Sequence, residues 1–353
     1  MSFKSSLKNN SVFMWKFASV QQSFRKRHKK IYENSNFKKI KLTKKEKNDY
    51  LKYWKVISPI VNLDTVEITK SLTGEYNKHI VPEEFYPLYI EPQLNPRHEI
   101  VFLENKSFYN KWFEGSYFPK DYFHKIDSQY YDKNLEIIEN IDNYIEGLSF
   151  EFPIVLKPSI DSYGGRDIYF INSLEELNIL HPKFRNLVVQ EKLKQSPKIS
   201  RFNPDSINSI RVCLLKVEGK FVVINTSLRM GKDGSLDNAT AGGIVCSISE
   251  DGKLNSFAVD KFCSKHLFHP NTEVVFDGET LPFYSSLIST SQEIAESIFN
   301  TDLVSLDMCL DDKDVWRCIE LNLFGQTIRF AQYAGKPFFG EYTDYVINRI
   351  AKN

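Results

Sequence analysis

The chain has 353 residues, of which 42% are hydrophobic and 26% are charged, and its formal net charge is +1. This length and apolar content are typical of a globular protein with a large core and two or more domains. The near-neutral charge argues against a nucleic-acid binder, because such a surface is usually strongly basic. Five cysteines without a CxxC pair indicate neither a disulfide framework nor a zinc site.

Two features bear on membranes. No apolar run reaches the roughly 18 residues of a membrane span, and the first twenty residues, interrupted by Lys16, make a poor signal peptide. We therefore expect a cytoplasmic protein. Residues 24–47 hold eleven Lys and Arg against two Glu, which could give a peripheral contact with anionic lipid or with a phosphate-bearing substrate. Such a run is also typical of the solvated side of surface helices, and the sequence leaves both interpretations open.

The first hundred residues are predicted to be helical or irregular. Thr43 precedes the segment "KKEKNDYLKYW", and Glu46 follows three residues later, which is the pattern of a capping box. Residues 81–99 carry four prolines and are predicted to be an extended linker. Residues 100–115 are predicted as a strand, a turn at Glu104 and Asn105, and a short helix.

From Phe152 onward the pattern predicts mainly strands. They are expected at 153–158, 167–171, 186–193, 209–217, 220–230, 242–249 and, as a pair, within 303–322. Helices are expected at 173–180, where Ser173 is the N-cap, at 287–300 and at 341–353. Antiparallel hairpins without regular βαβ alternation indicate the α+β class.

The segment "VLKPSIDSYGGRDI" predicts an anion site. Lys157 ends an apolar strand and supplies a point charge for a phosphate. The loop after it offers small donors and flexible backbone for close approach to that anion: Ser159, Ser162, Gly164 and Gly165. It is not a Walker loop, because the lysine precedes the glycines. The alternative is an ordinary β-hairpin with a Gly-Gly turn.

An acidic group near the C-terminus predicts a metal site. Glu320 and Asn322 alternate with apolar residues, so they share one face of a strand, and Asp307 lies on the corresponding face of the preceding strand. Across the hairpin they would bring three oxygen ligands together, which suits Mg²⁺. A chance grouping in a half-exposed hairpin is the alternative.

Two arginines interrupt apolar strands between these segments. Arg211 and Arg229 would need an anion if they were buried, and a bidentate oxyanion fits a guanidinium well. A structural salt bridge is the commoner arrangement for any single arginine. The loop that follows could hold a substrate or merely turn the chain; its candidate residues are Asp237, Asn238, Gly242 and Gly243.

The order of these motifs resembles the ATP-grasp superfamily. A lysine in a short "NK" turn, the strand ending in Lys157, "VVQEKL", the two arginine strands, an "N…GG" loop and D…ExN follow one another as they do there. D-alanine–D-alanine ligases share part of this set, and glutamate ligases resemble the stretch from 209 to 244 in layout. The sequence is most similar to the sugar-transfer-associated ATP-grasp proteins of surface-polysaccharide gene clusters, over roughly residues 40–345.

The resemblance implies an ATP-grasp fold, in which two α+β lobes clasp ATP. It places a helical N-terminal region at 1–100, a smaller lobe at 101–194 and a larger lobe at 195–353. It implies that Lys106 and Lys157 contact the ATP phosphates and that the loop from Ser159 to Gly165 covers the triphosphate. It also implies that Gln190, Glu191 and Leu193 lie at the adenine, and that Asp307, Glu320 and Asn322 bind Mg²⁺. Arg211 and Arg229 would stabilise an acceptor carboxylate or the transferring phosphoryl group.

One position departs from the D-alanine ligases, which carry an arginine two places before the metal-binding aspartate. Ser305 stands there in this sequence, so the task falls to Arg211, Arg229 or Arg329.

The expected activity is ATP-dependent joining of a carboxylate to an amine through an acylphosphate. By resemblance, the acceptor is a uronic-acid-type sugar or a polysaccharide precursor, and the cofactors are ATP and Mg²⁺. Lysines, arginine and Mg²⁺ would offset the repulsion between the carboxylate and the γ-phosphate. Two alternatives remain: a phosphotransferase acting on a small acceptor, and a non-catalytic nucleotide-binding scaffold of a glycan assembly complex.

Overall fold

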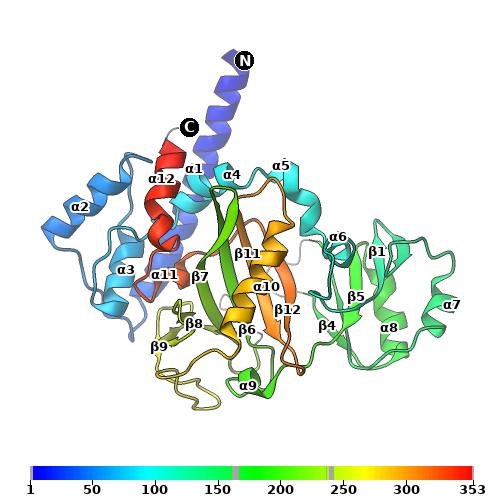
Figure 1. Ribbon diagram of the computed structural model, residues 1–353. Helices are drawn as coiled ribbons and strands as arrows, with labels where there is room; N and C mark the ends of the chain where they lie inside the picture. Colours follow the sequence, from blue (N-terminus) through cyan, green and yellow to red (C-terminus); the bar gives the residue numbers. More distant parts are fainter. Residues whose placement is uncertain (1–2, 161–166, 236, 238–241, 352–353) are drawn as a thin grey trace.

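The computed structural model describes residues 3–160, 167–235, 237 and 242–351. A five-stranded sheet lies to one side of a seven-stranded central sheet, and the N-terminal helices lie on the opposite side (Figure 1). Every paired strand in both sheets is antiparallel. The predicted α+β class is confirmed.

Three helices form most of the N-terminal region: α1 (Phe3–Tyr32), α2 (Lys44–Trp54) and α3 (Asp64–Thr73). The capping box of α2 is confirmed, because Thr43 Oγ1 accepts from the Glu46 N–H and the Glu46 carboxylate accepts from the Thr43 N–H. The first half of α1 extends away from the rest of the molecule (Figure 1). None of the described helices is both long enough and apolar enough to cross a bilayer.

The second half of α1 is held by buried charges. Arg27 and Arg329 both pair with the Glu83 carboxylate, and His28 Nδ1 lies 3.2 Å from Asp64 Oδ2. Burial lowers the pKa of His28, but the nearby carboxylates of Asp64 and Glu83 outweigh it and raise the pKa above its ordinary value. Removing one partner from such a buried group typically costs about 3–5 kcal/mol, so these contacts fix α1 to the body.

The segment from 81 to 112 differs from expectation. It is a series of short helical turns: η1 (Tyr86–Ile90, a π-helical turn), α4 (Glu91–Leu94), α5 (Arg97–Ile100), η2 (Val101–Glu104), η3 (Lys106–Phe108) and α6 (Tyr109–Trp112). The predicted extended linker and the predicted strand are therefore wrong, whereas the short helix after Asn105 is confirmed. Pro87 and Pro92 occupy first-turn positions, where a missing N–H costs no hydrogen bond.

The five-stranded sheet has the order β2-β1-β5-β3-β4. Its strands are β1 (Asp121–Ile126), β2 (Gln129–Asp132), β3 (Ile154–Lys157), β4 (Tyr169–Ile171) and β5 (Leu187–Glu191). Helices α7 (Ile141–Glu146) and α8 (Leu174–Leu180), followed by the turn η5 (His181–Lys183), belong to the same lobe. The three strands predicted here and the Ser173 cap of α8 are confirmed, whereas the sequence analysis missed the β1–β2 hairpin.

The central sheet has the order β10-β9-β8-β7-β6-β11-β12. Its strands are β6 (Ser209–Val217), β7 (Lys220–Met230), β8 (Ile244–Ile248), β9 (Leu254–Val259), β10 (Lys265–His266), β11 (Leu303–Leu310) and β12 (Trp316–Asn322). The helices are α9 (Pro197–Ser200), α10 (Tyr284–Glu296), α11 (Arg329–Gln332) and α12 (Thr343–Ala351), with the turn η6 (Gly340–Tyr342). The predicted strands and helices of this part are confirmed.

The hydrophobic cores join segments that are distant in sequence. Trp54 and Tyr86 from the N-terminal region share one core with Leu215 and Leu303 of the central sheet. Residues from α5 to Phe118 pack into the core that lies under α10, and the five-stranded sheet has a core of its own. The domain boundaries at 100 and 194 stay a prediction.

Candidate active site

A cleft of about 1230 Å³ is lined by residues of both sheets. The five-stranded sheet contributes Lys157 and Gln190, the central sheet contributes Arg211 and Asp307, and η3 contributes Lys106. Most of the candidates from the sequence analysis therefore line one cavity.

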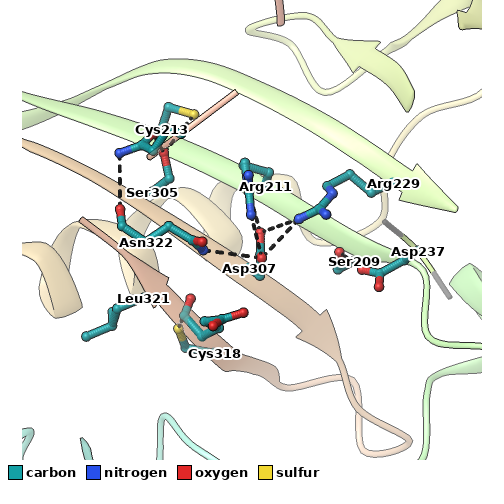
Figure 2. A network of polar contacts seen from close by, with 12 residues as sticks. Ser209, Arg211, Cys213, Arg229, Asp237, Ser305, Asp307, Cys318, Leu321 and Asn322 are labelled. Carbon is teal, nitrogen blue, oxygen red and sulfur yellow. Dashed lines mark hydrogen bonds and ion pairs between the residues drawn. The ribbon is translucent and has the colours of Figure 1, made fainter. Parts of the chain in front are cut away.

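The acidic group is assembled by the register of the β11–β12 hairpin. Asp307 lies directly opposite Glu320, and Asn322 lies opposite Ser305, one side-chain row away on the same face. Asn322 Nδ2 donates to Asp307 Oδ2 at 3.3 Å. The register thus brings Asp307, Glu320 and Asn322 together, and Figure 2 shows the side chain of Asn322 beside Asp307.

The arginines reach the same carboxylate from β6 and β7. Arg211 is the direct cross-strand partner of Asp307, and its Nε and Nη2 donate to the two carboxylate oxygens at 2.8 and 2.7 Å. Arg229 Nη1 lies 3.0 Å from both oxygens, as Figure 2 shows. Burial alone would raise the pKa of Asp307, but the two guanidinium groups hold it well below its usual range. The carboxylate is therefore ionised at any physiological pH.

These residues suit a hard divalent cation. The described part of the chain holds no group of three or more His, Cys, Asp and Glu side chains that could bind a metal. Asp307, Glu320 and Asn322 instead offer two carboxylates and an amide oxygen, and Mg²⁺ is commonly bound by one or two carboxylates together with substrate phosphates. Because Asp307 already accepts from both arginines, an ion here would need oxygens from a bound substrate.

Two buried lysines face the acidic group. The Lys106 N–H donates to the Ser159 carbonyl at 2.8 Å, which ties η3 to the loop after β3, and Lys106 Nζ lies 2.8 Å from Glu320 Oε1. Burial and the neighbouring Lys106 lower the pKa of Lys157 to about 8, although Glu320 and Asp121 oppose the shift. Two ammonium groups brought this close favour an anionic ligand.

The predicted phosphate loop is described only in part. Ser162, Gly164 and Gly165 lie outside the described residues. Ser159 is fully buried, and its hydroxyl has no hydrogen-bond partner among the residues that the structure describes. The flanking strands β3 and β4 pair directly, an arrangement compatible with a phosphate loop and with a plain hairpin.

The other candidates are distributed unevenly. Gln190, Glu191 and Leu193 line the cleft at the end of β5. Asp237 lines it too and accepts from the Ser209 hydroxyl, and burial raises its pKa above the ordinary value. Two further candidates, Gly242 and Gly243, are not among the lining residues, and Asn238 lies outside the described residues.

Arg329 and Ser305 bear on which arginine replaces the one that D-alanine ligases carry before the metal-binding aspartate. Arg329 is buried in α11, where its Nη1 donates to Glu83 at 3.1 Å, and it does not line the cleft. Ser305 donates to Cys213 Sγ at 3.1 Å and also pairs with Gln326. Arg211 and Arg229 are therefore the described guanidinium groups that line the cleft.

The sequence analysis missed one buried carboxylate close to the cleft. Asp121 begins β1 and accepts from Gln190 Nε2 at 2.6 Å and from Asn110 Nδ2 at 2.7 Å. An aspartate directly before the apolar-rich strand "YFHKI" is the only signal that could have revealed it.

Comparison with known proteins identifies the class of the fold. Two α+β lobes with lysines on one side of a cleft and acidic strands on the other define an ATP-grasp protein. The chain belongs to the sugar-transfer associated ATP-grasp family, whose sequence model matches residues 88–341. A search of curated proteins finds no match.

Solved structures with detectable similarity include two ligases and a synthase. An L-amino acid ligase from Bacillus licheniformis is 10% identical, with a TM-score of 0.42 over 71% of this chain and 48% of that one. A carboxyaminoimidazole ribonucleotide synthase from Aspergillus clavatus, complexed with ATP, is 13% identical, with a TM-score of 0.40 over 66% and 48%. A D-alanine–D-alanine ligase from Bacillus anthracis is 13% identical, with a TM-score of 0.40 over 71% and 67%. This chain thus spans about half the length of the first two.

Proposed function

We propose that this protein is an ATP-dependent carboxylate–amine ligase that works through an acylphosphate in the cytoplasm. One observation carries the proposal: Lys106 and Lys157 face Asp307, Glu320 and Asn322 across a single cleft. In keeping with the family's description, we propose a uronic-acid-type sugar or a polysaccharide precursor as the carboxylate, and an amino acid or another amine as the second substrate.

The proposed roles follow from charge. Lys106 and Lys157 would neutralise the triphosphate, because both ammonium groups are buried and close together. Asp307, Glu320 and Asn322 would hold Mg²⁺, which supplies a Lewis acid for phosphate oxygens when it is bound. Arg211 and Arg229 would offset the negative charge that builds up as the acceptor carboxylate approaches the γ-phosphate. No serine or cysteine nucleophile is required.

Product analysis tests the reaction class. The purified protein is incubated with ATP, Mg²⁺, amino acids and uronic-acid nucleotides, and the mixture is examined by mass spectrometry and a phosphate assay. A ligase produces ADP, free phosphate and an amide. Phosphorylated acceptor without free phosphate would indicate a phosphotransferase, and the absence of turnover with every acceptor would favour a binding scaffold.

Replacement of Glu320 tests the metal assignment. We expect Glu320→Gln to reduce Mg²⁺-dependent ATP turnover about a hundredfold or more, because it removes a charged ligand from the phosphate end of the cleft. Glu279→Gln is the matched control, since Glu279 is a comparably exposed glutamate paired with Arg201 outside the cleft. Equal turnover by the two variants would contradict the assignment.

We also propose a peripheral contact of the basic segment 24–47 with anionic lipid. Arg25, Lys26 and Lys30 are exposed on α1. Two large apolar side chains follow them toward the projecting end of the helix: Met14 is 62% exposed and Trp15 is 74% exposed. Cationic and aromatic side chains on one helix favour the interface of an anionic bilayer.

Sedimentation with vesicles tests this contact. We expect binding to phosphatidylcholine vesicles that contain 30% phosphatidylglycerol, and little binding without the anionic lipid. The triple variant Arg25→Gln, Lys26→Gln, Lys30→Gln should lose about 3 kcal/mol, because each cationic side chain near the surface contributes about 1 kcal/mol. Trp15→Ser should also weaken binding, whereas the control Phe299→Ser, at another largely exposed aromatic residue, should not. Equal binding to vesicles with and without phosphatidylglycerol would refute the contact.

A further inference from the structure

Asp121 and Gln190 form a buried pair at the back of the cleft. They are direct cross-strand partners on β1 and β5, and each side chain is only 3% exposed. Both oxygens of Asp121 accept from amide groups: Gln190 Nε2 at 2.6 Å and Asn110 Nδ2 at 2.7 Å. An ionised carboxylate only accepts hydrogen bonds, so the amide of Gln190 must turn its NH₂ group toward Asp121.

This orientation of the amide leaves the side-chain oxygen of Gln190 unpaired. Gln190 Oε1 is buried and has no hydrogen-bond partner among the described residues. Gln190 itself lines the cleft. A buried acceptor without a donor is costly, so an N–H of a bound ligand is the expected partner.

The surroundings of this oxygen suit a flat apolar ring. Gln190 pairs with Val155 of β3, so the two side chains lie together on one face of the sheet, and Ile168 and Phe170 also line the cleft. Lys157 is two residues beyond Val155 and therefore lies on the same face. A base placed against this apolar patch would have its phosphates near the lysine.

We propose that Asp121 is a positioning residue, which fixes the amide of Gln190 so that its carbonyl oxygen selects a purine with a 6-amino group over one with a 6-oxo group. This inference rests on the proposed nucleotide-binding function. The amino group of adenine donates to Gln190 Oε1, whereas a 6-oxo group would set two acceptors against each other. The neighbouring titratable groups are Lys157, Glu191 and His124, whose Nε2 lies 3.6 Å from Asp121 Oδ2; burial lowers the pKa of His124 to about 4, so its ring is neutral at neutral pH.

The test compares ATP with inosine triphosphate, which carries oxygen in place of the 6-amino group. Dissociation constants are measured by calorimetry at pH 7.5. Burial raises the pKa of Asp121 to about 6, so the carboxylate is ionised in this buffer. We expect the native protein to prefer ATP by at least about tenfold. Asp121→Asn is expected to abolish or invert that preference, because asparagine can donate to Gln190 Oε1 and allow the amide to turn.

A second variant keeps the test decisive if Asp121→Asn folds poorly. Gln190→Leu keeps the volume but removes the acceptor, so we expect weaker ATP binding and nearly equal constants for the two nucleotides. Native preference for ATP that persists in both variants would overturn the role of Asp121 and Gln190 and leave the ligase proposal standing. Failure of the native protein to bind either nucleotide would overturn both proposals.

Discussion

Asp307→Asn is expected to lower the free energy of unfolding by about 3 kcal/mol and to abolish ATP turnover. The substitution removes the negative charge that Arg211 and Arg229 share, and leaves two partly buried guanidinium groups without the carboxylate that they pair with. Breaking a buried charged group by removing one partner is among the most damaging single changes, at about 3–5 kcal/mol. Chemical denaturation followed by circular dichroism measures the first effect, and an ADP-release assay measures the second.

Asp314→Asn is the matched control for this variant. Asp314 lies in the turn of the same hairpin and pairs with the exposed Lys198. Exposed pairs contribute about 0–1 kcal/mol, so this control should remain close to the native protein in stability and turnover. If Asp307→Asn lost no more stability than Asp314→Asn, the ion pairs of Asp307 with Arg211 and Arg229 would not stabilise these strands.

A third variant separates the structural from the chemical role of Asp307. The combination Asp307→Leu, Arg211→Met, Arg229→Met replaces the whole group with apolar side chains of similar size, and such replacements are often neutral for stability. We expect most of the lost stability to return while turnover stays absent. Recovery of turnover would show that the chemistry does not depend on these charges.

The strands near the site were predictable because their signal is local. In "LVSLDMCL" and "WRCIELN" the polar residues alternate with apolar ones, which places Asp307 and Glu320 on defined faces without reference to distant residues. A short acidic turn then fixes the hairpin and brings the two carboxylates opposite each other. Local alternation and a tight turn were sufficient for the acidic half of the site.

The partners of these carboxylates could not be predicted in the same way. Asp307 meets Arg211 only because β11 pairs with β6, and Lys106 reaches Glu320 from a turn more than two hundred residues earlier. Register between distant strands depends on global packing, which one sequence does not reveal. The sequence left open whether Arg211 and Arg229 bind a substrate anion or form a structural salt bridge, and in this structure both pair with Asp307.

The segment from 81 to 104 shows a second reason why a prediction from sequence failed. Its four prolines suggested an extended linker, but two of them begin helical turns, where the absence of an N–H is harmless. The buried side chains of Tyr86 and Ile90 then pack into the core beside the central sheet. Tertiary burial overrode a local signal, and the result places η3, with Lys106, at the edge of the cleft.

Lys157→Met is expected to weaken ATP binding and to remove its pH dependence, which is measured as the dissociation constant of ATP at a series of pH values. Lys157 has a pKa lowered to about 8, first by burial and then by Lys106, so its ammonium is charged below that pH and neutral above it. An ATP site that relies on this ammonium should bind with constant affinity from pH 7 to 8, and then lose up to about tenfold per pH unit. The triphosphate is at least about nine-tenths ionised from pH 7 upward, since the last pKa of a phosphate group is near 6.

Lys157→Met should bind ATP at least about tenfold more weakly at pH 7, because a hydrogen bond to a charged group contributes about 1.5–3 kcal/mol, and it should show no further loss up to pH 9.5. Lys216→Met is the control, since Lys216 packs over the Phe221 ring outside the cleft and should leave the midpoint near 8. If the affinity of the native protein fell with a midpoint near pH 10, Lys157 would be in contact with water and not buried. A pH dependence that persisted in Lys157→Met would mean that a group other than Lys157 binds the phosphate.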